Sequence, residues 1–269
     1  MKKILFTIAI ISLLLAGCDK ESNNGIDSEI NITMMEDLSG AIQLYFSTTK
    51  IYPCMNYWID LSWKRSSNNI DVTFKGVISP GVCLRALGPA TETLNLGVLN
   101  NGTYQLSFYN RDERQSGELI VSSEGYRINF ANNSLVHFRN IPLNRIPENT
   151  IWVVVSYNEE NLLLSFLEAF MELDVTEKSN VTRGYYSFEN YHMLGVFSGF
   201  KAENDGSITF LPSFTNCGVM LGRRFMRSFV FQNSESSANI EQLIRQHREQ
   251  IEIRAFTDKG EQFMSWLMN

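Results

Sequence analysis

The chain has 269 residues, a formal net charge of −6, a hydrophobic content of 44% and an aromatic content of 12%. This composition predicts a folded protein with substantial hydrophobic cores rather than a disordered chain. Because the chain is acidic and has no long basic run, it is a poor candidate for binding nucleic acid. Its length fits one large domain or two ordinary ones.

The first 19 residues, MKKILFTIAIISLLLAGCD, have the layout of a secretory signal peptide. Lys2 and Lys3 give a positively charged start, and residues 4–16 form an almost unbroken apolar run. A membrane-spanning helix needs about 20 apolar residues, so this run is too short for a permanent span. We therefore expect residues 1–17 to be a signal peptide.

The run ends in Leu15, Ala16, Gly17 and Cys18, which resemble the lipobox of bacterial lipoproteins. The resemblance implies that a peptidase cuts before Cys18 and that the Cys18 thiol carries a diacylglycerol. Each buried methylene contributes about 0.8 kcal/mol, so two or three acyl chains anchor a protein stably. Cys18 is thus the predicted lipidation site, and the lipid is the predicted contact with the membrane.

The residues after Cys18 bear on which membrane holds the protein. The acidic run Asp19-Lys20-Glu21 resembles the surface-export signal of Bacteroidetes lipoproteins, which implies an outer-membrane protein exposed at the cell surface. An aspartate directly after the cysteine instead resembles an inner-membrane retention signal of enterobacteria. Residues 22–28 are polar, so we expect residues 18–29 to form a flexible, lipidated tether.

Three further cysteines are present, at positions 54, 83 and 217. The oxidising envelope favours a disulfide between Cys54 and Cys83, whose loop closure is worth about 3 to 4 kcal/mol. Cys217 is then unpaired. No histidine lies near it in the sequence, so we expect a buried small side chain rather than a reactive thiol.

Residues 30–140 alternate between apolar and polar side chains with a period of two, which predicts successive half-buried strands. The expected strands are residues 30–34, 41–46, 57–63, 70–74, 94–96, 103–109, 118–121, 126–130 and 135–138. The segment 99–106, with Gly102 and Tyr104, resembles the Gly-x-Tyr entry into a late strand of bacterial immunoglobulin-like domains. The resemblance implies a β-sandwich in which the tyrosine hydroxyl bonds to the backbone at a corner.

Residues 141–149 contain two prolines and separate this region from one of different character, so we expect them to be a linker. Residues 150–157 are a nearly continuous β-branched and aromatic run, as in a central strand. Asn158 is expected to cap a helix that follows, because the first turn holds Glu159 and Glu160. A second helix is expected after residues 234–237.

Strands are also expected at residues 184–189, 191–197, 207–211, 224–232 and 251–256. The order of elements resembles an elaborated ferredoxin-like, or split βαβ, fold, so residues 150–269 are expected to form an α+β domain. The tail, residues 258–269, fits a hairpin or one helical face, and we favour the hairpin.

No motif for metal, acyl-transfer or nucleotide chemistry occurs in the sequence. His137, His192 and His247 share no metal-ligand spacing, and His247 falls on an apolar stripe. We therefore expect no metal and no cofactor, and the sequence favours a non-catalytic protein. The compact basic group Arg223, Arg224 and Arg227 is expected to be a solvated strand edge rather than an acidic-ligand site.

Trp58 and Trp63 are the candidate ligand contacts. They are an odd number of positions apart, so they face opposite sides of one strand and at most one can lie in a core. An exposed tryptophan can stack on a sugar ring or anchor a protein partner. The first expected function is accordingly a lipid-anchored envelope protein that binds a glycan or a protein.

Two other functions stay open. The protein can be a structural or assembly component, such as an adhesin or a fimbria-associated spacer, in which case a bare edge strand awaits a partner strand. It can also be a glycoside hydrolase, because dispersed acids such as Asp60, Asp71, Glu189 and Glu203 can converge in a fold. No pair of acids stands out in the sequence.

Overall fold

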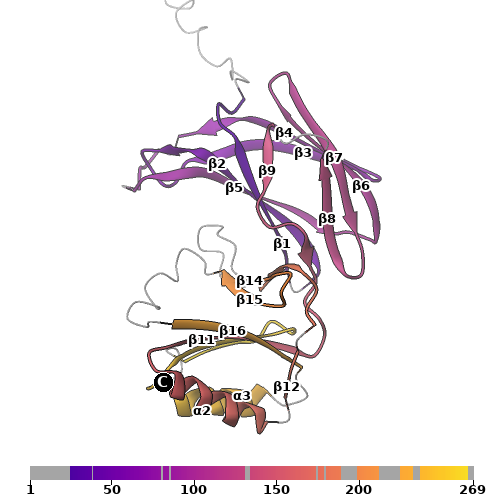
Figure 1. The fold of residues 1–269 in the computed structure, drawn as a ribbon. Coiled ribbons are helices and arrows are strands. Elements are labelled where there is room, and N and C mark those ends of the chain that lie inside the picture. Colours follow the sequence, from indigo (N-terminus) through magenta and orange to yellow (C-terminus); the bar gives the residue numbers. More distant parts are fainter. Residues whose placement is uncertain are drawn as a thin grey trace, which may run out of the picture.

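The structure is a computed structural model (Figure 1). It describes residues 25–37, 39–79, 81–84, 86–130, 134–173, 175–178, 180–188, 199–211, 225–232 and 237–265. The fold is mainly β, with 57% strand, and the described residues form a 13-stranded mixed sheet, a five-stranded antiparallel sheet and two short helices. This confirms the expected β-rich class. None of these helices is long and apolar enough to cross a membrane.

Several expectations fall outside the described residues. They are the signal peptide, the lipidation site Cys18, Cys217, His192, Glu189, Arg223, Arg224 and the strand expected at residues 191–197.

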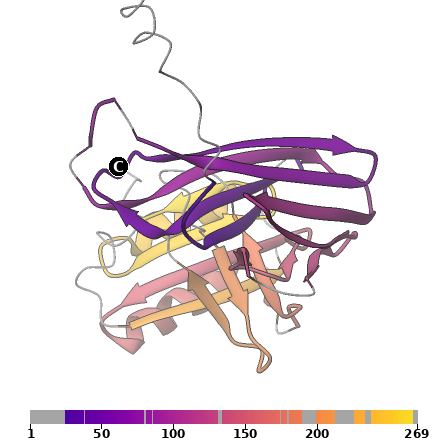
Figure 2. The same ribbon diagram turned by 90° about the horizontal axis from the view of Figure 1, so that it is seen from above.

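The large sheet holds most of the strands (Figures 1 and 2). They are β1 (Ile30–Glu36), β2 (Ala41–Tyr52), β3 (Trp58–Ser66), β4 (Asn69–Ile78), β5 (Gly88–Val98), β6 (Gly102–Asn110), β7 (Glu113–Val121), β8 (Gly125–Phe130), β9 (Val136–Phe138), β10 (Leu143–Asn144), β13 (Gly184–Ser187), β14 (Gly199–Ala202) and β15 (Ile208–Leu211). Their order in space is β15-β14-β13-β10-β8-β7-β6-β4-β3-β5-β2-β1-β9. The pairs β1–β9, β3–β5, β4–β6 and β10–β13 are parallel, and the others are antiparallel.

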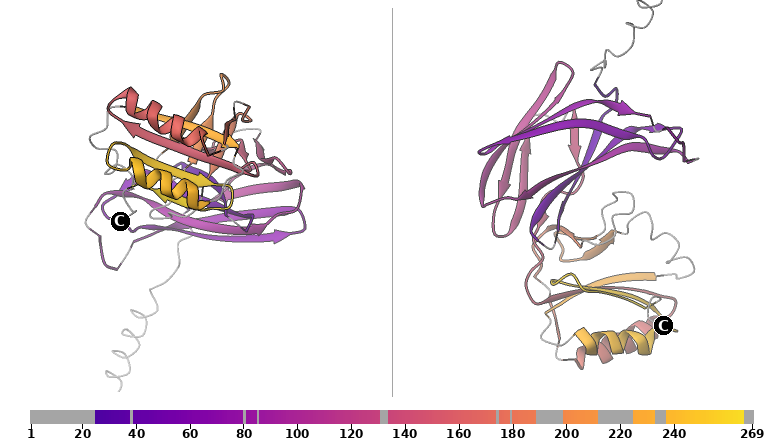
Figure 3. Two further views of the ribbon diagram at one scale, coloured as in Figure 1. Left: turned by 90° about the horizontal axis from the view of Figure 1, so that it is seen from below. Right: turned by 180° about the vertical axis from the view of Figure 1, so that it is seen from behind.

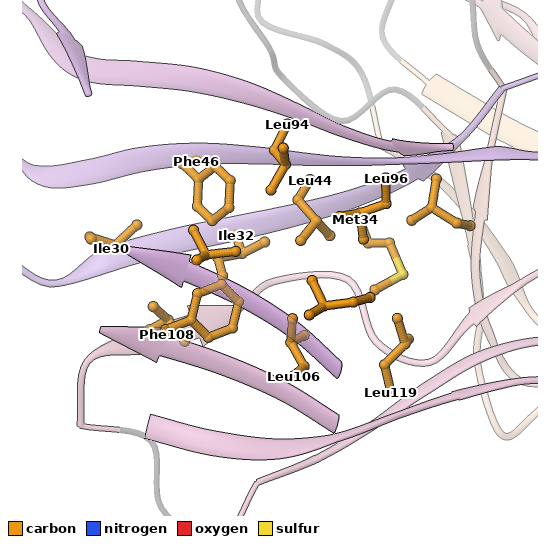
Figure 4. Packing of buried hydrophobic residues seen from close by; sticks show 14 of the residues in the cluster. Ile30, Ile32, Met34, Leu44, Phe46, Leu94, Leu96, Leu106, Phe108 and Leu119 are labelled. Atoms are coloured by element: carbon orange, nitrogen blue, oxygen red, sulfur yellow. The ribbon is translucent and has the colours of Figure 1, made fainter. Parts of the chain in front are cut away.

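The part of this sheet from β1 to β9 curls around one hydrophobic core (Figure 4). The inward positions of the alternating strands supply the core, as the period of two predicts. The ring centroid of Phe46 lies 5.5 Å from that of Phe74 and 6.2 Å from that of Phe108, so three strands meet at one aromatic contact. The alternation seen in the sequence therefore did mark the buried face.

One buried glutamine joins β9, at one end of the curl, to β7 near the other end. Gln115 of β7 is fully buried, and its Oε1 accepts hydrogen bonds from the backbone N–H of Leu135 at 2.8 Å and of Val136 at 3.0 Å. Its Nε2 donates to the carbonyl of Val136 at 3.2 Å. The side-chain amide thus supplies the hydrogen bonds between β7 and β9, whereas backbone groups join the other strands of the sheet.

Two asparagines act in the same way. Asn140 accepts from the N–H of Met34 at 2.9 Å and donates to its carbonyl at 2.6 Å. Asn110 accepts from the N–H of Ile26 at 2.7 Å and donates to its carbonyl at 2.9 Å. Both asparagines are buried, so these bonds satisfy backbone groups that water does not reach.

The second sheet has the order β12-β16-β11-β17-β18. Its strands are β12 (Thr176–Glu177), β16 (Phe225–Gln232), β11 (Thr150–Tyr157), β17 (Glu252–Thr257) and β18 (Gln262–Met264). Helices α2 (Glu160–Met171) and α3 (Ser237–His247) cover one face, as Figure 3 shows, and β13 to β15 cover the other. The expected hairpin in the tail is confirmed by the pairing of β17 with β18.

Strand β11 is buried at every position. Ile151, Val153 and Val155 pack against the helices, whereas Trp152 and Val154 pack against the aromatic side chains of β13 to β15. A strand covered on both faces needs an apolar side chain at nearly every position. The expected central strand is therefore present where the sequence placed it.

The helix after β11 begins differently from the prediction. Its N-cap is Glu159, which has an extended backbone and no side-chain capping bond, so the expected cap at Asn158 is wrong by one residue. Glu159 keeps an extended backbone because β11 ends only two residues earlier, at Tyr157. The acidic first turn still complements the helix dipole through Glu160.

Residues 141–149, expected to be a linker, contain β10, which pairs with β8 on one side and with β13 on the other. Through it, three strands from the second half of the chain extend the sheet of the first half. Gly184 permits this junction, because a Cβ there would lie 2.5 Å from the Asn144 amide nitrogen.

The closure by Gln115 can be tested by substitution. Gln115→Ala leaves two backbone N–H groups and one carbonyl without their partner, and we expect a loss of about 3 kcal/mol in the free energy of unfolding. Denaturant titration measures this loss. Gln105→Ala is the matched control, because Gln105 is exposed and makes one backbone bond, to Gly117. Equal losses in the two variants would contradict the closing role.

Candidate functional site

Exposed apolar side chains gather at one end of the large sheet, in residues 51–58 and 78–87, which we together call the tip. The disulfide Cys54–Cys83, predicted from the sequence, joins the two segments of the tip, and its Cα atoms lie 5.3 Å apart. The strands on either side are paired as well, since Trp58 lies opposite Ile78 in the register of β3 and β4. The tip is thus a single structural unit.

Hydrogen bonds fix the second segment of the tip on the first. The Asn56 side chain donates to the carbonyl of Val82 at 2.7 Å and accepts from the N–H of Leu84 at 3.1 Å. Gly88 approaches Met55 so closely that an added Cβ would lie 3.0 Å from the Met55 Cα. A backbone held in this way presents its side chains in a defined arrangement.

The most exposed apolar side chains of the tip are aliphatic. Val82 is 78% exposed and Leu87 is 76% exposed, and Ile51 and Leu84 are exposed beside them. Residues 51–59 and 76–91 contain a single charged side chain, Arg85, although 19% of the whole chain is charged. Grouped exposed aliphatic side chains without charges mark a surface that contacts something apolar.

The two candidate tryptophans lie in different places. Trp58 is 40% exposed and belongs to the tip. Trp63 is 41% exposed. It pairs with buried Val72 of β4, so it lies on the core side of β3. It is exposed there because β3 pairs with β5 only at Trp58 and Thr91, five residues earlier. The register of β3 with β4 shifts between Asp60 and Leu61, so the spacing of the two tryptophans does not by itself fix their relative orientation. The structure does not bring the two indoles together.

The edge of β5 that faces β3 is partly covered. The N–H of Thr91 donates to the carbonyl of Tyr57, the residue before β3. The N–H of Thr93 points to the same edge of β5. The side chain of Glu92 accepts from Thr93 at 2.9 Å, and that of Asn95 accepts from Gly97 at 2.7 Å. Such side chains blunt an edge strand, which does not favour assembly by strand addition here.

Of the four acids named from the sequence, the three that the structure describes are each paired with a different lysine. Asp60 lies 3.9 Å from Lys75, Asp71 lies 3.5 Å from Lys64 and Glu203 lies 2.6 Å from Lys201. Each acid therefore has its own lysine. Within the described residues, no group of three or more histidine, cysteine, aspartate or glutamate side chains is placed to hold a metal ion.

The histidines and Arg227 have structural contacts. His137 lies 3.8 Å from Glu29. His247 packs edge-on against Phe166, and burial lowers its pKa, as expected at the rim of a core. Arg227 forms an ion pair with Glu160 at 3.0 Å, which fits the expected solvated strand edge.

A cleft of about 210 Å³ lies where the two sheets meet, lined by the ends of β1, β10, β13 and β17. At its wall, Tyr126 donates to Glu36 Oε1 at 2.6 Å, and Arg145 Nε lies 3.2 Å from the same oxygen. Arg145 also donates to the Tyr126 hydroxyl at 3.1 Å. Burial, followed by the bond to Glu36, raises the pKa of Tyr126, so the phenol stays protonated and donating.

The acids at the rim of the cleft are also engaged within the protein. Asp37 accepts from the N–H groups of Ser39 and Ala41, and although burial opposes this effect, the hydrogen bonds lower its pKa. Asp258 accepts from the N–H of Asn149. The polar groups of the cleft thus tie its walls together, and the tip is the better candidate for a functional surface.

Sequence reasoning identified Trp58 and the disulfide but missed the rest of the tip. Residues 78–87 do not alternate and include no motif. The available signal was the near absence of charge on both sides of the two cysteines, which distinguishes these segments from the rest of the chain.

Removing the disulfide should destabilise the protein and loosen the tip. We expect the double variant Cys54→Ser, Cys83→Ser to lose about 3 to 4 kcal/mol in the free energy of unfolding, because the closed loop spans 29 residues. Reductant should destabilise the wild type and leave the double variant unchanged. Mapping under non-reducing conditions should find the two cysteines linked, and free thiols at both positions would contradict the pairing.

Comparison with known proteins adds no relative to this picture. No protein-family model matches the chain, and no match was found among curated proteins or solved structures. The function is therefore inferred from the residues of the tip and from the N-terminal sequence.

Proposed function

We propose that the protein is a non-catalytic lipoprotein of the bacterial envelope, anchored through a lipid on Cys18, that uses the tip as its docking surface. The single observation that carries the docking role is the exposure of Val82 and Leu87 on a segment fixed by the Cys54–Cys83 disulfide. The anchor is supported by the lipobox residues 15–18. The acidic run after Cys18 supports the outer membrane, with exposure at the cell surface.

The chemistry of the tip bears on the partner. A glycan site needs an aromatic platform with free polar groups around it. The tip has aromatic rings in Tyr52, Tyr57 and Trp58, but the Asn56 amide beside them is already bonded to the backbone. Exposed aliphatic side chains instead suit an apolar surface. The glycan partner is therefore less well supported than an apolar one.

We also propose a finer description of the two halves. The curled sheet is an elaborated immunoglobulin-like sandwich, supported by Tyr104, whose hydroxyl donates to the carbonyl of Asn100 at 3.0 Å as a tyrosine corner does. The five-stranded sheet with two helices on one face is an elaborated split βαβ arrangement. Residues 184–186 repeat the Gly-x-Tyr pattern, and Tyr186 donates to the carbonyl of Thr182 at 2.6 Å. The same local corner therefore occurs in both halves of the chain.

The anchor is tested by labelling cells with a tagged fatty acid. The wild type should incorporate the label and Cys18→Ala should not, because the thiol is the atom that is acylated. Cys217→Ala is the matched control and should keep the label. Labelled fatty acid on Cys18→Ala would overturn the lipoprotein assignment.

The docking role is tested with residues 18–269 carrying Cys18→Ala, purified with the disulfide formed and mixed with isolated envelopes. Retention should fall at least about tenfold when Val82 and Leu87 are both changed to glutamate, because two exposed aliphatic side chains lose their apolar contact. Val98→Glu is the matched control, since Val98 is 60% exposed at the other end of β5. Equal retention of the wild type and the tip variant would contradict the docking role.

A further inference from the structure

We infer that the tip docks on the bilayer that holds the Cys18 lipid, so that the protein contacts its membrane at two points. This inference rests on the proposed anchor and on the tip as docking surface. It names the partner of the tip, and three observations carry it: where the tether enters the fold, which side chains the tip carries, and how little charge they carry.

The tether enters the fold on the strand that leads into the tip. The N–H of Gly25, the first described residue, donates to the carbonyl of Lys75 in β4 at 3.1 Å. Strand β4 ends three residues later at Ile78, where the second segment of the tip begins, a distance of roughly 10 Å along a strand. The point of attachment and the tip are therefore neighbours.

The tether is shorter than the expected residues 18–29, because Ile26 is buried and hydrogen-bonded to Asn110 as part of the fold. Seven residues lead from Cys18 to Gly25, and a fully extended chain covers at most about 3.6 Å per residue, or roughly 25 Å in all. Gly25 consequently stays within about that distance of the lipidated residue. The curled sheet, which carries the tip and the start of the described chain, lies at one end of the molecule, and α2 and α3 lie at the opposite end (Figures 1 and 3).

The side chains of the tip suit the boundary between acyl chains and headgroups. Val82, Leu84 and Leu87 are exposed on the second segment. On the first segment, the rings of Tyr52 and Tyr57 stack with their centroids 4.7 Å apart, and the Lys50 ammonium lies 5.7 Å from the Tyr52 ring. At such a boundary aliphatic side chains favour the acyl chains, aromatic rings favour the interface and cations favour the headgroups.

The charge of the protein indicates how the tip would bind a membrane: by inserting apolar side chains or by attraction to anionic headgroups. The whole chain is acidic, so attraction to anionic lipid does not drive the contact. The tip instead offers apolar area with almost no charge to desolvate. Docking should therefore occur on neutral phosphatidylcholine and change little with salt.

The lipid anchor also explains how the small apolar surface of the tip is sufficient for a stable contact with the membrane. A protein–protein contact of standard size buries about 800 Å² on each partner. A few exposed side chains on a loop supply less, but the anchor converts their contact with the membrane into an intramolecular event with a high effective concentration. A bilayer adapts to the loop and needs no complementary shape.

The test uses the lipidated full mature protein, reconstituted into protein-free phosphatidylcholine vesicles whose acyl chains are brominated near the headgroup. Bromine quenches tryptophan fluorescence at short range, and the signal of Trp58 is the difference between the wild type and Trp58→Phe. We expect Trp58 to be quenched. The quenching should be lost when Val82 and Leu87 are both changed to glutamate and kept in Val98→Glu.

The other outcomes overturn the inference. If Trp58 is not quenched while envelopes retain the unlipidated protein through the tip, the partner is a protein or glycan of the envelope, and the proposed function stands. If the Val98→Glu variant loses quenching as well, the contact does not belong to the tip. If Cys18 carries no fatty acid, the inference falls together with the anchor. Unfolding curves of each variant exclude loss of the fold as a cause.

Discussion

The structure depends on side-chain amides that take the place of backbone pairing. A sheet that curls around its core must either complete its ladder or leave an edge with unsatisfied groups. Here β9, at one end of the curl, is joined to β7, near the other end, through the buried Gln115 amide. This amide has both a donor and an acceptor and so matches a strand backbone. Asn140 and Asn110 repeat this solution at β1 and at Ile26. The first core is sealed, and the long strands β2 and β5 can extend beyond it to the tip.

The second constraint is the double burial of β11. Helices on one face and the aromatic layer of Tyr186, Phe200 and Phe210 on the other leave no position of this strand in contact with solvent. That layer belongs to strands of the large sheet, so the two sheets share a core through Trp152. The two halves of the chain are consequently joined both by a hydrogen-bonded strand, β10, and by packing.

Local patterns in the sequence predicted much of this. The alternation in residues 30–34 and 70–74 identified strands β1 and β4, and the continuous apolar run of residues 150–157 identified β11. The sequence did not predict that β13 to β15 join the first sheet, because the pairing of Leu143 with Tyr185 is non-local and leaves no period in either segment. For Trp58 and Trp63, the odd spacing in the sequence predicted side chains on opposite faces of β3. Their exposure depends on where β3 separates from β5, which no local pattern records.

The disulfide also bears on when the tip can take its final form. The two segments of the tip lie far apart along the chain, and each holds one of the paired cysteines. In a reducing cytoplasm the thiols stay apart, and the aliphatic side chains are not held in a common array. If the N-terminal residues direct export, as the sequence predicts, this bond forms only after translocation. The covalent link between the two segments of the tip would then be added last, on the far side of the membrane.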